Sequence, residues 1–186
     1  MLDLMLRRRS VRKFTAEPVS EANRERILSA GLITPSSMGK NPVELVAVTD
    51  RDTILSLKQC KPRGGQPLEE ASFVVAVLAN SDLSDVWVED ASIAATYIML
   101  EAEQLGLGCT WLQIRNREGT TAPSEDMVRA LLGAPKNMGV LCMMCIGHKN
   151  EEKLPYTEAD IRLSKLHREI WSHTVGFRIT GTPQCF

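Results

Sequence analysis

The spacing of apolar side chains along the chain predicts alternating short strands and helices. Four runs are rich in apolar and β-branched residues, are too short for most helices and are bounded by polar or turn-forming residues, as β-strands usually are. These predicted strands cover residues 43–49, 72–79, 109–114 and 140–146. The run at 72–79 carries apolar residues on both of its faces, which predicts a central strand with helices covering both sides of the sheet.

Between these runs, apolar residues recur at helical spacing. Ser20 and Asp50 precede two such segments and are good N-caps, while Gly106 and Gly133 are placed to end two others. The segment at 89–105 has the strongest pattern and contains small residues that allow close packing, so we expect it to be the core helix. The predicted helices cover residues 2–9, 20–32, 50–57, 89–105, 123–132 and 160–171.

The chain length favours one α+β domain, because 186 residues can bury one sizeable core but are few for two. The tail from 172 to 186 contains a possible strand at 177–180 and has too little apolar surface to fold alone. We therefore expect this C-terminal extension to pack against another surface. The whole chain, 1–186, is predicted to be a single domain.

Charge, apolar run length and cysteine content indicate the compartment and the kinds of partner to expect. The formal net charge of −1 gives no overall attraction to nucleic acid or to a membrane surface. The longest apolar runs fall well short of the roughly 20 residues of a membrane-spanning helix, and the N-terminal charges follow the apolar stretch, unlike those of a signal peptide. Five scattered cysteines do not form a disulfide framework, so we expect a cytoplasmic protein.

The densest chemical signal is the segment from Arg7 to Lys13, which holds five cations and the hydroxyl of Ser10. Arginine forks, a hydroxyl and main-chain N–H groups can satisfy the several acceptor oxygens of a phosphate monoester. The segment is therefore a candidate anion site. Two alternatives remain, a solvated basic patch and an arm that binds nucleic acid. The arm has less support, because the sequence has no interleaved aromatic residues and no second basic stripe.

Other possible sites are weaker. Cys142 and Cys145 have the spacing of a metal or redox half-site, but in a strand residues three apart face opposite sides, so we interpret them as core residues. No G-x-G-x-x-G motif follows a strand, which leaves a tightly held dinucleotide unsupported. His148 is interpreted as a loop histidine without a role in chemistry.

Several motifs, taken in order, resemble those of the nitroreductase family. They are the basic Arg-x-Ser-x-Arg-x-Phe segment at the N-terminus, Pro-Ser-Ser near position 35, and the helix with Asp90-Ala91-Ser92-Ile93-Ala94-Ala95 that ends in Leu105-Gly106-Leu107-Gly108. The resemblance covers about residues 3 to 170. It implies an FMN-dependent α+β fold with a central mixed sheet of four to five strands flanked by helices. It also implies an intertwined homodimer with each FMN at the subunit interface, and the C-terminal extension would then pack on the partner.

The resemblance assigns the phosphate end of FMN to the basic segment. Arg8 and Ser10 would hold the phosphate and ribityl end, and Arg12 would point at the pyrimidine edge of the flavin, with Arg9 as a neighbour. A cation at that edge stabilises the negative charge of reduced flavin and favours acceptance of hydride. Either Lys149 or Lys153 would help to neutralise the phosphate, and the sequence leaves that choice open.

The flavin ring would be met by two other segments. Pro35, Ser36 and Ser37 match the family loop that reaches the flavin from the partner subunit. Gln113 and Ile114 match positions whose backbone N–H groups lie near N5 and O4 of the ring. Gly147 falls in the family's closing strand and turn, and is the last predicted cofactor-binding residue.

The function that the resemblance implies is an FMN-dependent oxidoreductase. Two electrons would pass from NADH or NADPH through the flavin to a small acceptor such as a nitroaromatic or a quinone, in ping-pong order. No protein nucleophile, catalytic side chain or metal is expected, because hydride passes directly between nicotinamide and flavin. The alternative is a flavin-binding redox sensor or store without turnover.

Overall fold

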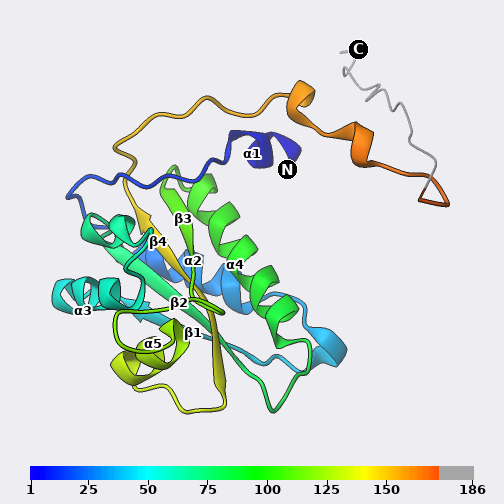
Figure 1. Cartoon of the computed structure of the whole chain (residues 1–186). Helices are drawn as coiled ribbons and strands as arrows, with labels where there is room; N and C mark the ends of the chain where they lie inside the picture. The colour runs from blue at the N-terminus through cyan, green and yellow to red at the C-terminus, as the bar shows by residue number, and fades with distance from the viewer. Residues whose placement is uncertain (172–186) are drawn as a thin grey trace.

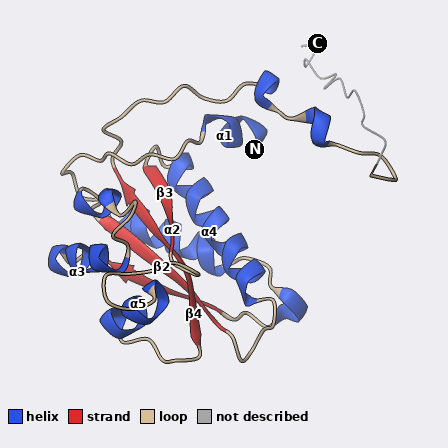
Figure 2. Ribbon diagram, viewed as in Figure 1, coloured by secondary structure: helices blue, strands red, loops and turns tan. Residues whose placement is uncertain are grey.

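The computed structural model describes residues 1–171, which form a four-stranded sheet with helices on both faces (Figures 1 and 2). The α-helices are α1 Leu2–Arg7, α2 Glu21–Leu32, α3 Arg51–Leu57, α4 Trp87–Gln104 and α5 Ser124–Leu132. The strands are β1 Val43–Val48, β2 Phe73–Asn80, β3 Gly108–Gln113 and β4 Met138–Gly147. Short 3-10 turns cover Ser37–Gly39, Lys58–Cys60, Gln66–Glu69, Glu158–Asp160 and Leu163–Lys165. No helix within these residues is long and apolar enough to cross a membrane.

The sheet has the strand order β1-β2-β4-β3, and each neighbouring pair of strands is antiparallel. The α+β class and the number of strands are as predicted, but the prediction of a mixed sheet was wrong for these four strands. An apolar run such as β2 is typical of parallel strands because helices cover both of their faces. Here an antiparallel sheet has the same double covering. The parallel pairing among the described residues is an isolated bridge from Ser10 to Cys109 at the edge strand β3.

Two hydrophobic cores lie on the two faces of the sheet. One contains buried side chains of α2 and α4, and the other contains those of α3 and α5 (Figure 2). Cys142 belongs to the core on the α4 face and Cys145 to the core on the α3 and α5 face, so the two thiols lie on opposite sides of the sheet as predicted. Burial raises the pKa of both thiols well above the ordinary value, which keeps them protonated core residues.

The helix ends follow the predicted caps. The hydroxyl of Ser20 accepts a hydrogen bond from the N–H of Asn23 at 3.3 Å, and the carboxylate of Asp50 accepts one from Thr53 at 2.8 Å. Gly133 ends α5 with φ of 68°, a left-handed conformation that glycine adopts without steric cost. Local signals of this kind depend on neighbours in sequence, so they can be read without knowledge of the tertiary structure.

Replacing Ser20 with alanine is expected to lower the free energy of unfolding by about 1 kcal/mol, because an N-cap hydroxyl satisfies an otherwise unpaired N–H group. Urea denaturation monitored by circular dichroism measures this difference. Ser29→Ala, in the interior of the same helix, is the matched control and should leave the stability unchanged or raise it slightly. Equal losses in the two variants would contradict the capping role.

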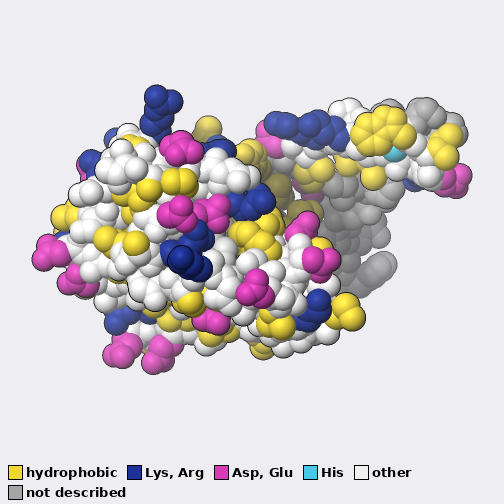
Figure 3. Space-filling model, turned by 60° about the horizontal axis from the view of Figure 1, so that its bottom comes forward, with side chains coloured by type: hydrophobic (Ala, Val, Ile, Leu, Met, Phe, Trp, Pro, Cys, Tyr) yellow, Lys and Arg dark blue, Asp and Glu magenta, His cyan; other side chains and the backbone are white. Residues whose placement is uncertain are grey.

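The C-terminal segment does not form the predicted helix at 160–171. It leaves the domain above α1 and contains the two 3-10 turns at Glu158–Asp160 and Leu163–Lys165 (Figure 1). In the space-filling view of Figure 3, the end of the described chain extends away from the rest of the domain. A helix of about 12 residues is marginal in water unless tertiary packing supports it, and this segment has little of the domain to pack against. Several of its apolar side chains are exposed, among them Leu154, Ile170 and Trp171. The predicted strand at 177–180 and the tail at 172–186 lie outside the described residues.

Candidate functional site

The basic N-terminal segment is anchored on the sheet by two buried side chains. Val11 and Phe14 are buried, while the cations between them stay at the surface. The N–H of Val11 donates to the carbonyl of Cys109 at 3.1 Å, and the N–H of Phe14 donates to the carboxylate of Glu70 at 2.8 Å. The segment therefore crosses the start of β3 in a fixed position with its charged side chains outward.

Two glycines make this docking possible. A Cβ atom added at Gly108 would lie 2.6 Å from Cγ1 of Val11, and one at Gly147 would lie 3.0 Å from the Cβ of Phe14. Any larger residue would therefore displace the basic segment. This contact gives Gly147, a predicted cofactor-binding residue, a packing role beneath the segment.

A cleft of ≈ 950 Å³ lies between the N-terminal segment and the chain that follows β4. Its lining includes four cations and two carboxylates, namely Arg7, Arg9, Lys149, Lys153, Glu151 and Glu152. The other lining residues are Val11, Asn150, Leu154 and Pro155. Arg9 closes one side by donating a hydrogen bond to the carbonyl of Leu154 and by stacking over the ring of Tyr156 at 4.4 Å. The cleft joins two segments that are distant in sequence and carries clustered positive charge.

The structure separates the two candidate lysines. Lys149 forms an ion pair with Glu103 at the end of α4, with 2.9 Å between Nζ and Oε2. Lys153 instead donates to the main-chain carbonyl of Ser10 and lies 3.1 Å from Glu151. Lys153 is thus the lysine that is brought to the basic segment, whereas Lys149 is held by a carboxylate on another element.

The guanidinium of Arg8 is not engaged by other side chains of the described residues. Among residues 1–171 its guanidinium makes no hydrogen bond or ion pair. Burial raises the pKa of the Cys109 thiol to about 12, and the positive charge of Arg8 opposes that rise, which places the guanidinium close to the start of β3. A half-buried arginine with all five donors free is suited to bind an anion.

Arg12 contributes through its main chain as well as its side chain. Its N–H donates to the carboxylate of Glu151, and this bond holds the pKa of Glu151 below its ordinary value of 4.5. Glu151 therefore stays ionised at neutral pH and limits the excess positive charge beside Lys153. The side chain of Arg12 is exposed and reaches back to the carbonyl of Ser10 at 3.5 Å.

The Pro35-Ser36-Ser37 loop lies at the other end of α4 from the basic segment. The N–H of Ser37 donates to the carboxylate of Asp90 at 2.9 Å, and the hydroxyl of Ser84 donates to the same buried carboxylate at 3.0 Å. Asp90 lies in the first turn of α4, whereas Lys149 contacts its last turn. Since Asp90 and Glu103 are 13 residues apart in α4 and each residue rises about 1.5 Å, roughly 20 Å separates the two regions within one chain.

Gln113 and Ile114 lie at the end of β3, one strand length from the basic segment. The side chain of Gln113 accepts a hydrogen bond from the indole of Trp111 at 2.9 Å and donates one to the carbonyl of Arg115 at 3.0 Å. Ile114 is fully buried, and its N–H donates to the carbonyl of Leu141 at 3.1 Å. A ligand would reach the Ile114 N–H only in exchange for that bond.

The arrangement fits FMN along β3. The edge strand runs about 17 Å from Gly108 to Gln113, with free cationic donors at its start and polar groups at its end. A molecule with a phosphate at one end and a planar polar ring at the other matches this order of groups. The sequence interpretation missed the roles of Asp90 and Glu151, because Ser37 and Arg12, whose N–H groups they bind, are 53 and 139 residues away. A carboxylate among the small apolar residues of the helix was the available signal for Asp90.

Comparisons with known proteins identify the family to which the chain is similar. A model described as the nitroreductase family matches residues 5–71 and 56–148. An Archaeoglobus fulgidus protein, whose name describes an NADH dehydrogenase/NAD(P)H nitroreductase, is 34% identical over 91% of this chain and 98% of its own length. The NADPH-flavin oxidoreductase of Vibrio harveyi is 32% identical over 86% of this chain and 71% of its length. The structure of an FMN-dependent nitroreductase from Clostridium difficile R20291 superimposes with a TM-score of 0.88 at 37% identity, covering 91% of this chain and 99% of that one.

Proposed function

Because this chain belongs to the nitroreductase family, we propose that it is an FMN-dependent oxidoreductase that passes two electrons from NADH or NADPH to a small acceptor. The observation that carries the proposal is the cluster of cations at the start of the edge strand, where Arg7 and Arg9 line the cleft and the Arg8 guanidinium between them in sequence makes no hydrogen bond or ion pair among residues 1–171. When bound, FMN supplies the redox chemistry by accepting hydride from the nicotinamide and giving the electron pair to the acceptor.

Residues of this chain would hold the phosphate of FMN. Arg8 and the hydroxyl of Ser10 would donate to phosphate oxygens, and Lys153, already on the carbonyl of Ser10, would complete the charge balance. Arg9 would close the cleft, and Arg12 would face the pyrimidine edge. Gln113 would meet the ring at the end of β3, and the N–H of Ile114 would do so by exchanging its bond to the carbonyl of Leu141.

The proposal includes a homodimer with FMN at the subunit interface. The family resemblance assigns Pro35, Ser36 and Ser37 to the flavin of the partner chain, and a two-fold axis would let each chain supply this loop to the other. Exposed Leu154, Ile170 and Trp171 on the extended C-terminal segment favour the same arrangement, since a partner would cover them. Light scattering is expected to give twice the mass of the chain, and a monomer would contradict this part of the proposal.

The acceptor class is a nitroaromatic or a quinone, reduced in ping-pong order in a reducing cytoplasm. In ping-pong order the oxidised nucleotide leaves before the acceptor takes its place above the ring. Initial rates at several fixed acceptor concentrations should then give parallel lines in double-reciprocal plots. Intersecting lines would replace ping-pong order with a ternary complex. The four cysteines among the described residues are unpaired, which supports the reducing location.

A flavin-binding redox sensor or store is the alternative from the sequence. It would use the same Arg8, Ser10 and Arg12 site and would bind FMN without steady-state oxidation of NADH or NADPH. Turnover with menadione and with a nitroaromatic, each compared with an acceptor-free reaction, distinguishes the two functions. The names of the relatives describe enzymes, which supports turnover.

A further inference from the structure

A row of connected side chains runs along β3 on the face covered by α4. The indole of Trp111 donates to Gln113, and the amide of Gln113 donates to the carbonyl of Arg115. The guanidinium of Arg115 lies over the ring of Trp87 at 5.6 Å from its centroid. The row therefore begins beside the sheet core and ends in a cation held by the first residue of α4.

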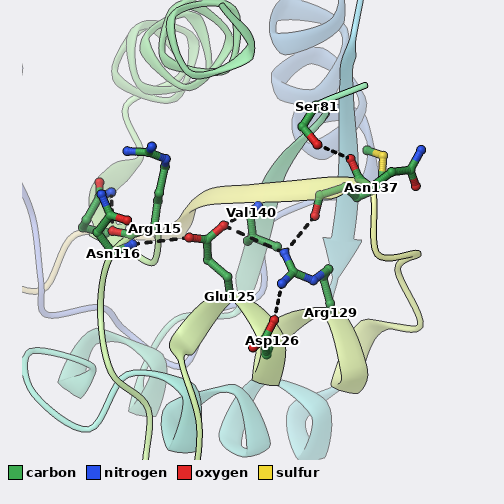
Figure 4. Close-up of polar contacts among 10 residues, drawn as sticks. Ser81, Arg115, Asn116, Glu125, Asp126, Arg129, Asn137 and Val140 are labelled. Carbon is green, nitrogen blue, oxygen red and sulfur yellow. Dashed lines mark hydrogen bonds and ion pairs between the residues drawn. The ribbon is translucent and has the colours of Figure 1, made fainter. Parts of the chain in front are cut away.

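Arg115 carries an uncompensated charge within the described part of the chain. It is half-buried and makes no ion pair among residues 1–171. The neighbouring acid Glu125 is engaged elsewhere, because its carboxylate accepts from the N–H groups of Asn116 and Val140 and lies 3.9 Å from Arg129. Figure 4 shows Arg115 pointing away from Glu125. An aromatic face holds a guanidinium in place without neutralising it.

We propose that Arg115 is a specificity-determining residue that selects acceptors carrying a carboxylate or another anionic group. The inference rests on the proposed function, in which Gln113 and Ile114 meet the flavin ring. Arg115 follows Gln113 by two residues, about 7 Å along an extended chain. An aromatic acceptor above the ring can thus place its reducible group at the flavin and an anionic substituent at the guanidinium. A guanidinium can bind a carboxylate through two parallel hydrogen bonds.

The reaction balances with reagents that the proposed activity supplies. For 4-nitrobenzoate, NAD(P)H loses a hydride, the nitro group gains that electron pair and two protons in total, and one N–O bond breaks. The products are NAD(P)+, 4-nitrosobenzoate and water, with one proton taken from solvent. The carboxylate is unchanged and serves only for recognition.

A matched pair of acceptors tests the inference in the FMN-loaded dimer. Wild-type protein is expected to have a higher kcat/KM for 4-nitrobenzoate than for 4-nitrobenzamide, which has nearly the same shape without the charge. Arg115→Gln should lower the ratio of the two kcat/KM values about tenfold, the scale of one charge-assisted hydrogen bond. Arg115→Lys keeps the charge and should retain part of the preference. Equal ratios in wild type and Arg115→Gln would overturn the inference.

Binding provides a readout that does not depend on turnover. Isothermal titration of the oxidised, FMN-loaded protein with benzoate and with benzamide should show a preference for benzoate that Arg115→Gln removes and 0.5 M NaCl weakens. If Arg115→Gln does not fold, the salt dependence and Arg115→Lys still decide the matter. Absence of turnover with both nitro compounds contradicts the proposed function, whereas turnover without a charge preference contradicts only the role of Arg115.

Discussion

Replacing Arg8 with alanine is expected to weaken FMN binding by about 10- to 100-fold, because a hydrogen bond to a charged group contributes about 1.5–3 kcal/mol. The loss should be large because Arg8 has no partner among the described residues that already satisfies its donors. Arg8→Lys keeps the charge but not the planar fork, so its affinity should lie between those of the wild type and the alanine variant. Titration of apoprotein with FMN, followed by quenching of flavin fluorescence, measures all three dissociation constants.

The control for Arg8→Ala is a variant that removes one positive charge far from the proposed phosphate site. Lys136 is exposed in the connection between α5 and β4, at the other end of the sheet from Ser10 and Cys109. Lys136→Ala changes the net charge as Arg8→Ala does and should leave FMN affinity within a factor of two or so, as surface charges contribute little at a distance. Wild-type affinity in Arg8→Ala would remove Arg8 from the phosphate site.

Replacing Gly108 with alanine is expected to lower both stability and FMN affinity. The new methyl group would lie 2.6 Å from Cγ1 and 2.9 Å from Cβ of Val11, a side chain that is β-branched and only 3% exposed. Such overpacking costs about 1–3 kcal/mol in free energy of unfolding. The basic segment must shift to relieve the contact, and Arg8 and Ser10 shift with it.

A double-mutant cycle assigns the effect to this contact. Val11→Ala removes the Cγ1 methyl group, which makes the shorter contact, and leaves Cβ in place. Gly108→Ala combined with Val11→Ala should therefore be less destabilised than the sum of the two single variants by about 0.5–3 kcal/mol. Urea denaturation and FMN titration of the four proteins give the coupling free energy for both quantities. Strict additivity would show that Gly108 and Val11 act independently and that the docking described here is incorrect.

The sequence predicted those features that depend on nearby residues. Ser20 and Asp50 cap helices within three residues of themselves, and Gly133 ends α5. Each of these follows from backbone geometry and local hydrogen bonding. The family resemblance then brought the basic segment and Lys153 together as candidates, and the structure places Lys153 on the carbonyl of Ser10.

Features set by distant contacts could not be predicted in the same way. The antiparallel pairing of β2 with β4 is decided by the path of the chain, since apolar runs of this kind occur in both sheet types. The predicted helix at 160–171 failed because helical spacing alone does not supply a surface to pack against. Ser37 is held by Asp90 across 53 residues, and no local pattern links the two.

The most direct test of the central claim is an anaerobic absorbance spectrum of the FMN-loaded protein before and after addition of NADH and then of NADPH. The account predicts that at least one of the nucleotides bleaches the oxidised-flavin band, which would establish the cofactor and the electron donor together. Bound FMN that stays oxidised with both nucleotides would contradict an NAD(P)H-dependent oxidoreductase and would favour a flavin-binding sensor or store.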